Sequence, residues 1–258
     1  MGDLFLLSQA QMRRIEGYFP LSHGIARVED RGIVSAIVFV IKNGLRWRDA
    51  APDYGPHKTI YNRFVRWSRL GVFNKIFAEL ARKGGKPKRI MIDATHLKAH
   101  RTSQPFKKGP VPRRIGRTKG GLNSKLHAVC DSNGRPLVMM LSEGQMSDFK
   151  GAALMLPAMP KARELLADKG YDADWFRAAL AKRGVAACIP SKSNRKVAIP
   201  HDALLYKQRH KIENMFGRLK DWRRIHTRYD RCAHTYFSAI CLAAAVLFWL
   251  SSMSPEPR

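Results

Sequence analysis

The sequence predicts an α/β fold in which a mixed sheet with flanking helices follows a small helical domain. Two observations lead to this prediction. Helical apolar patterns fill the first part of the chain, whereas β-branched, strand-like runs begin only at Arg89. From there the expected order is strand, hairpin, helix, strand, helix, strand, helix and helix, which is typical of sheets that mix antiparallel and parallel pairs. We therefore predict a helical domain over residues 1–84 and a sheet domain over residues 85–258.

The helical domain is predicted from two helices separated by a turn-rich segment. Residues 32–44, GIVSAIVFVIKNG, are apolar nearly all round and end at a glycine, as expected of a buried helix. In the later run HKTIYNRFVRWSRLG, the residues Ile60, Phe64 and Trp67 recur at helical spacing and form an inward-facing stripe. This order is typical of helix-turn-helix-like modules that bind DNA.

The opposite face of this second helix is polar and basic. At about 100° per residue, Lys58, Asn62 and Arg69 lie across from the apolar stripe, with Arg66 nearby. We predict that this face enters a groove of DNA. The alternative is a solvated basic face on a structural helix.

A second basic segment follows a predicted linker, residues 81–88. Residues 101–121 are rich in proline, glycine and basic residues, which predicts a flexible surface loop. With seven positive charges and no acid, the loop is either a clamp for phosphates or simply a solvated segment. The residues assigned here to DNA binding are Lys107, Lys108, Arg113, Arg114, Arg117 and Lys119.

The elements of the sheet domain follow from alternating apolar residues and turn residues. A hairpin is expected around residues 131–134, because Asn-Gly accepts positive φ. Helices are expected to begin near Ser147 or Asp148 and near Asp172 or Asp174, which suit helix N-termini. The apolar run over residues 236–250 is too short to span a bilayer comfortably, so we predict a buried helix and no membrane partner.

The net charge points to a nucleic-acid partner. The chain has 258 residues with 47 Lys and Arg against 20 Asp and Glu, a formal charge of +27. Such an excess favours a polyanion, because neutralising phosphates releases condensed counterions. The four cysteines form no CxxC pair, and the N-terminus lacks the basic region of a signal peptide. We therefore expect reduced thiols and a cytoplasmic location.

Because acids are scarce, each carboxylate can be considered singly. Turns and helix N-termini account for most of them. Three do not fit such positions: Asp93 lies inside a strand, Asp168 ends the apolar strand ELLAD, and Glu213 stands on a helix among cations. Aspartate is disfavoured within strands, and ligands of open α/β sheets bind at the carboxyl edge.

The segment that holds Glu213 is expected to present one narrow polar face. On a regular helix Tyr206, Arg209, Glu213 and Lys220 share this face, beside an apolar arc that packs on the sheet. The alternative is an ion-paired surface, since Arg209 and Glu213 are i,i+4 neighbours. Three carboxylates that converge in a basic protein indicate divalent metal, because Mg²⁺ prefers oxygen ligands.

Three motifs resemble the DDE transposases of bacterial insertion sequences, specifically the insertion sequence five family. They are IDATHLKAH around Asp93, ADKGYDAD around Asp168 and YKQRHKIENMFGRLK around Glu213. The last one is similar to the family pattern Tyr-x2-Arg-x3-Glu-x6-Lys at Tyr206, Arg209, Glu213 and Lys220. The similarity runs over essentially the whole chain.

The resemblance implies a ribonuclease H-like catalytic domain in which Asp93, Asp168 and Glu213 bind two Mg²⁺ ions, with Mn²⁺ as a possible substitute. It implies cleavage of double-stranded DNA at terminal inverted repeats and joining of the freed 3′-hydroxyl to target DNA. Tyr206, Arg209 and Lys220 would position the DNA, and a homodimer would pair two ends in the nucleoid of a bacterium. The alternatives are a ribonuclease H-like nuclease without strand transfer and a non-catalytic DNA-binding protein.

Overall fold

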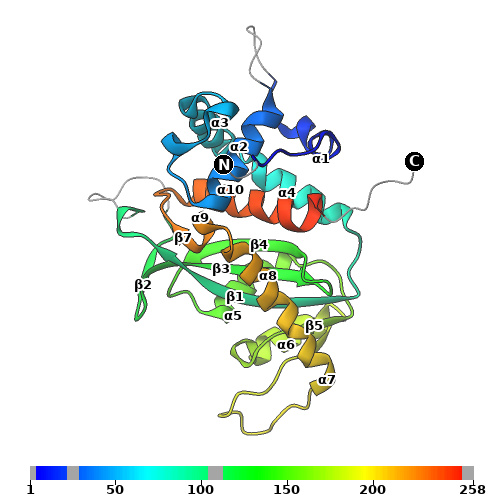
Figure 1. Cartoon of the computed structure of the whole chain (residues 1–258). Coiled ribbons are helices and arrows are strands. Elements are labelled where there is room, and N and C mark those ends of the chain that lie inside the picture. The colour runs from blue at the N-terminus through cyan, green and yellow to red at the C-terminus, as the bar shows by residue number, and fades with distance from the viewer. Residues whose placement is uncertain (1–3, 22–28, 104–112, 252–258) are drawn as a thin grey trace. The chain divides into compact units, whose positions relative to one another are not determined.

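The computed structural model describes residues 4–21, 29–103 and 113–251 (Figure 1). The chain divides into two compact units. The first takes residues 1–80, 100–113 and 219–258, and the second takes residues 81–99 and 114–218. The boundary expected from the sequence, at 84/85, differs from this division mainly at the C-terminus. There the apolar helix packs with the helical unit rather than with the sheet.

The first unit is helical because its elements share long apolar stripes. α3 buries Ile60, Phe64 and Trp67 as predicted. α2 ends at Gly44, whose φ of 73° favours glycine. The elements of this unit are α1 (Gln9–Arg13), α2 (Asp30–Asn43), α3 (His57–Arg69), most of α4 (Val72–Lys83), α9 (Arg223–His226), β7 (Thr227–Arg228) and α10 (Ala233–Ala244).

The C-terminal helix lies in the core of this unit. α10 packs against α2 and α3 and continues as a π-helical stretch, Ala245–Leu250. The 18 residues from Ala233 to Leu250 have a mean hydropathy of 1.7, enough by length and composition to cross a membrane. Because 78% of this segment is buried inside the protein, a core helix accounts for its apolar composition.

The second unit is built on a mixed sheet. Its strand order is β2-β3-β1-β5-β6, with β4 also paired to β3. The β1–β3, β2–β3 and β3–β4 pairs are antiparallel, whereas β1–β5 and β5–β6 are parallel. The strands are β1 (Arg89–Ala99), β2 (Gly116–Thr118), β3 (Gly121–Asp131), β4 (Pro136–Glu143), β5 (Glu164–Leu166) and β6 (Ala186–Cys188).

Helices cover both faces of this sheet. α5 (Asp148–Met155) and α6 (Asp174–Lys182) pack on the face that carries Ile90 and Ile92. The other face receives α8 (His210–Lys220), which runs across the sheet after the short α7 (Ala203–Tyr206) (Figure 1). α8 buries its apolar arc as expected, with side chains less than 6% exposed at Ile212, Met215, Phe216 and Leu219.

Three local expectations are wrong in detail. α4 extends to Lys83, so the predicted linker over residues 81–88 is partly helical. β2 lies within the predicted loop 101–121, where Gly116–Thr118 pairs with the start of β3. The helix expected from Tyr206 is interrupted by a 3-10 turn at Lys207–Arg209, so the regular wheel applies only from His210.

Of the two residues expected to begin a helix here, Asp174 begins α6, whereas Asp172 is a buried ion-pair centre. Its side chain is 1% exposed and accepts hydrogen bonds from Arg177 (2.8 Å), Arg195 (2.9 Å) and the backbone N–H of Lys192 (2.9 Å). Burial opposes ionisation of Asp172, but these donors outweigh it and hold its pKa well below the usual range. The loop after β6 is thereby fixed to the turn that carries Asp168.

Replacing Asp172 tests this clamp. We expect Asp172→Ala to lower the free energy of unfolding by about 3 kcal/mol, because two partly buried guanidinium groups lose the carboxylate that they share. Asp174→Ala is the matched control: Asp174 also pairs with Arg195, at 2.7 Å, but is 85% exposed, so we expect a loss of about 0.5 kcal/mol. Equal losses, measured by chemical denaturation, would contradict the clamp.

The pH dependence has a defined sign. Because folding lowers the pKa of Asp172, its stabilising contribution is complete above the ordinary value of 3.8 and is lost as the pH falls below it. The difference in free energy of unfolding between the wild type and Asp172→Ala should therefore shrink below this pH.

Candidate active site

Asp93 and Asp168 are brought together by the parallel pairing of β1 with β5. In this register Met91 lies opposite Leu166. Continuing both chains by two residues places Asp93 beside Asp168, and neighbouring strands lie about 4.8 Å apart. The electrostatic influence of Asp168 on Asp93 agrees with this proximity. Two acids expected from widely separated motifs therefore meet at the carboxyl edge of β5.

Asp93 is held in a partly buried position. Its side chain is 17% exposed; Oδ1 accepts a hydrogen bond from the Ala94 N–H at 2.8 Å, and Oδ2 accepts one from Arg209 Nη1 at 2.8 Å. Burial raises the pKa of Asp93 to about 6, and the nearby Asp168 charge adds to the rise, whereas Ala94 and Arg209 oppose it. A cation beside this carboxylate is therefore strongly favoured.

Asp168 is fixed by the 3-10 turn that it begins. Its Oδ1 accepts a hydrogen bond from the Gly170 N–H at 2.8 Å, at the start of the turn Lys169–Tyr171. A Cβ atom at Gly170 would lie 2.9 Å from this same oxygen, closer than real Cβ contacts allow. Gly170 therefore lets the backbone approach the carboxylate and fix its orientation.

Arg209 links Glu213 to Asp93. Its Nη1 bonds to Asp93, and its Nη2 donates to Glu213 Oε1. The Arg209 side chain is 17% exposed and that of Glu213 is 53% exposed, so Glu213 is the solvent-exposed member of the pair. Burial would lower the pKa of Arg209, but the charges of Asp93 and Glu213 outweigh it and raise the pKa above the usual value.

Polar contacts fix the start of α8 on the sheet. Arg89 Nη1 donates to Gln208 Oε1 at 2.8 Å, while Arg89 Nε pairs with Glu164 at 2.7 Å. Lys211 Nζ donates to the Ser132 carbonyl in the hairpin turn at 2.7 Å. These contacts flank Arg209 on both sides, so its position is set by the fold. Lys211 therefore serves to hold α8 against the hairpin turn.

The structure adds an acid that the sequence analysis assigned only to a helix N-terminus. Asp148 pairs with the nearly buried Lys125 at 2.7 Å, and its Oδ2 lies 3.6 Å from the position of a Cβ on Gly170. Asp148 therefore stands close to Asp168. Sequence spacing gives no signal for this, because Lys125 and Asp148 come from a strand and a helix joined by the β4 hairpin.

Tyr206 and Lys220 are less closely tied to the carboxylates. The Arg209 guanidinium lies 5.9 Å from the centre of the Tyr206 ring. Lys220 ends α8 and is half-buried, and burial lowers its pKa. It lines a hollow of about 380 Å³ in the helical unit with Arg223 and His226.

The carboxylate oxygens at this site are suitable ligands for a hard cation, but the side chains are not arranged as a complete metal-binding site. Among the residues that the structure describes, no group of three His, Cys, Asp or Glu side chains is close enough to hold a metal ion. Arg209 instead supplies positive charge to Asp93 and Glu213.

The residues assigned to DNA binding are spread over both units. On α3, Lys58, Asn62, Arg66 and Arg69 are all exposed, as predicted. Of the basic segment, Arg117 and Lys119 are exposed and Arg113 is half-buried. Arg114 pairs with Glu143 at 3.2 Å. Lys107 and Lys108 lie outside the described residues.

Family comparisons identify similar proteins. Residues 7–77 match a family model described as "Putative transposase of IS4/5 family (DUF4096)", and residues 84–248 match "Transposase DDE domain". A "Putative transposase for insertion sequence element IS6501" from Brucella ovis is 34% identical over 130 residues, which are 50% of this chain and 99% of the relative. A similar protein for element IS402 from Burkholderia cepacia is 30% identical over 156 residues, 53% of this chain and 72% of the relative.

The fold is also similar to a solved structure. A piggyBac transposase in a synaptic complex with hairpin DNA aligns with a TM-score of 0.53 at 10% identity, covering 93% of this chain and 70% of that one. At this identity the likeness concerns the fold.

The double contact of Arg209 can be tested in the metal-free protein. We expect Arg209→Gln to raise the pKa of Asp93 further above about 6, because a favourable charge is removed from a buried carboxylate that adjoins Asp168. Carboxyl-carbon NMR titration measures this pKa. Lys207→Gln, in the same turn but exposed, is the control and should leave the pKa of Asp93 in place. An unchanged pKa in Arg209→Gln would contradict the contact.

Proposed function

The chain belongs to the family of DDE transposases of bacterial insertion sequences, and from that premise we propose that Asp93, Asp168 and Glu213 are its catalytic carboxylates. The observation that carries the proposal is the convergence of the three motifs. Asp93 adjoins Asp168 through the strand register, and Arg209 joins Asp93 to Glu213. A DNA-binding protein without chemistry has no need for three acids gathered in this way.

Divalent-metal dependence follows from membership of this family. We propose that Asp93, Asp168 and Glu213 hold two Mg²⁺ ions, for which Mn²⁺ can substitute. The donor set fits, because all three side chains offer carboxylate oxygens. Burial, and after it the charge of Asp168, raises the pKa of Asp93, so a further cation beside this carboxylate would favour its ionised form. When bound, the ions would offset charge at phosphorus and assist both the attacking and the leaving oxygen.

The protein's own groups then orient the reacting DNA. Arg209 Nη1 donates to Asp93, whereas Nη2 donates to the exposed Glu213. Nη2 can therefore exchange Glu213 for a phosphate oxygen of the DNA while Nη1 stays bonded to Asp93. Tyr206 and Lys220 are proposed to hold the DNA backbone on either side. In the first step water bonds to phosphorus and the bond to the 3′-oxygen breaks, which releases a 3′-hydroxyl. In the second step that hydroxyl attacks a target phosphate and displaces its 3′-oxygen.

DNA is proposed to lie against the basic face of α3 and the segment that contains Arg113, Arg114, Arg117 and Lys119. The four α3 residues present a row of exposed polar and basic groups suited to phosphates and groove edges. We propose that this face binds the terminal inverted repeats, that two copies of the chain pair the two ends as a homodimer, and that the reaction takes place in the cytoplasm on nucleoid DNA.

Triad variants test the catalytic assignment. We expect Asp93→Asn, Asp168→Asn and Glu213→Gln each to lower Mg²⁺-dependent cleavage of an end-containing duplex by more than about 100-fold, since even outer-shell partners of metal ligands contribute 10–100-fold. DNA binding, measured by gel shift, should persist. A chelator should abolish cleavage by the wild type.

Asp221→Asn is a matched control, because Asp221 is an exposed acid just beyond the end of α8. Full cleavage by any triad variant would contradict the role of that residue. Cleavage without joining of a pre-nicked end to target DNA would indicate a nuclease rather than a transposase.

The α3 face makes a prediction about salt. Removing Lys58, Arg66 and Arg69 together by alanine substitution should weaken duplex binding and reduce the slope of log affinity against log salt by about 3, at about 0.9 for each phosphate contact. Lys75→Ala, an exposed lysine on α4, is the control and should leave the slope unchanged. An unaltered slope in the triple variant would place the duplex elsewhere.

A further inference from the structure

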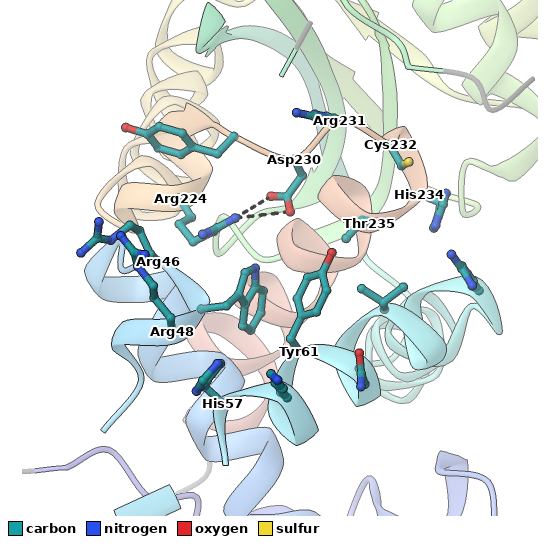
Figure 2. Close-up of a pocket in the computed structure, with 16 residues that line it drawn as sticks. Arg46, Arg48, His57, Tyr61, Arg224, Asp230, Arg231, Cys232, His234 and Thr235 are labelled. Carbon is teal, nitrogen blue, oxygen red and sulfur yellow. Dashed lines mark hydrogen bonds and ion pairs between the residues drawn. The ribbon is translucent and has the colours of Figure 1, made fainter. Parts of the chain in front are cut away.

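The helical unit contains a hollow of about 720 Å³ that includes none of the three proposed catalytic carboxylates, and its lining shares Lys58, Asn62 and Arg69 with the proposed DNA-binding face of α3 (Figure 2). One side of the hollow is formed by α3 and by the turn around Trp47, and the other side is formed by Arg224 and residues 229–235. Its volume is in the range of ligand sites, roughly 300–1,000 Å³. Both sides of the hollow belong to one compact unit, so it is a property of that unit alone.

The lining is strongly basic. Six arginine or lysine side chains reach it, with two histidines, against the single acid Asp230. Asp230 is paired with Arg224 at 3.3 Å, and both side chains are at most 10% exposed. The remaining basic side chains include the exposed Lys58 and Arg69 of α3. The hollow therefore suits an anion.

Aromatic rings interleave with these cations. Tyr61 and Tyr229 line the hollow and are 44% and 42% exposed. Trp47 also lines the hollow, and its ring centre lies 5.6 Å from that of Tyr61. The Arg224 guanidinium lies 5.3 Å from the Trp47 ring and 5.9 Å from the Tyr229 ring. The His100 ring packs against Tyr229, with ring centres 4.9 Å apart, and the exposed parts of Tyr61 and Tyr229 supply aromatic surface inside a basic hollow.

Hydrogen bonds and packing contacts hold the backbone next to Tyr229. Arg228, fully buried, donates from Nε to the Asp230 carbonyl at 2.8 Å and packs 4.8 Å from the Tyr236 ring. Asp230 is held by Arg224, and Arg224 Nη1 also donates to the Leu45 carbonyl at 2.9 Å. The backbone on the C-terminal side of Tyr229 is therefore fixed, and an aromatic platform that is already ordered costs little entropy when it binds.

We propose that this hollow binds an unpaired nucleotide of the DNA, with its base stacked on Tyr61 or Tyr229 and its phosphates on the surrounding cations. Single-stranded DNA is bound by combinations of basic grooves and exposed aromatic rings, because every base has a face on which a ring can stack. A fully paired duplex offers only phosphates and groove edges, since its base faces are covered within the stack. The proposal rests on the proposed function in taking DNA as the partner.

Binding by the full chain to three probes tests the proposal: a single strand about ten nucleotides long, a duplex with one unpaired nucleotide, and the fully paired duplex. We expect the duplex with the unpaired nucleotide to bind about tenfold more tightly than the paired one. Alanine substitution of the tyrosine that carries the base, Tyr61 or Tyr229, should reduce this preference about tenfold, whereas the phenylalanine variant at the same position should retain it because it keeps the ring. Trp175→Ala, which removes a 40% exposed ring in the other unit, is the matched control and should retain the preference.

A thiol provides a second measurement. Cys232 lines the hollow and is half-buried, whereas Cys130, Cys188 and Cys241 are buried. A thiol reagent should label Cys232 several-fold more slowly when the single strand is present, and the tyrosine-to-alanine variant that loses the binding preference should also lose this protection. Cys232→Ser identifies the labelled site.

The outcomes separate this inference from the proposed function. Equal binding of paired and unpaired probes, with cleavage intact, would overturn the hollow as a nucleotide site and leave the transposase assignment standing. A preference that survives both tyrosine-to-alanine variants would also overturn it. Protection of Cys232 by the single strand without any duplex binding would support the hollow and contradict the DNA face of α3.

Discussion

The site depends on one cation that is shared between two carboxylates. Asp93 is partly buried beside Asp168, and two neighbouring negative charges in such a position are unfavourable without positive charge. Arg209 supplies that charge and also contacts Glu213, so the strand acid and the helix acid are joined through a guanidinium. The planar, five-donor guanidinium suits this geometry better than a lysine would. A bound divalent ion would, like Arg209, offset the repulsion between the neighbouring carboxylates.

The rest of the sheet unit keeps these groups in place. On either side of Arg209 in the sequence, Gln208 accepts a hydrogen bond from Arg89 of β1, and Lys211 donates one to the hairpin turn. At the other carboxylate, Asp168 begins a short turn, and Asp172 at the end of that turn is clamped by two arginines. Catalytic geometry of this kind requires neighbours that fix each side chain. The many arginines of the sequence thus include several with structural roles, beyond those available to DNA.

Much of this arrangement could be predicted from the sequence, because it depends on local patterns. The hairpin at Asn133-Gly134, the stop of α2 at Gly44 and the buried stripe of α3 follow from turn residues and helical spacing. The family and the mixed sheet were also predicted, and the comparisons confirm them. The role of Asp172 could not be predicted, since Arg195 is distant in sequence and an aspartate near a helix start suits an N-terminus equally well. The basic hollow was missed for the same reason, because its two sides come from opposite ends of the chain.

The central claim is that Asp93, Asp168 and Glu213 form one metal site. A crystal structure of the protein with end DNA and Mn²⁺, phased to reveal the anomalous signal of manganese, tests it most directly. The account predicts anomalous peaks in contact with carboxylate oxygens of all three residues, with Arg209 turned from Glu213 toward the DNA. Peaks confined to other residues, or Arg209 still bound to both acids beside correctly placed DNA, would contradict it.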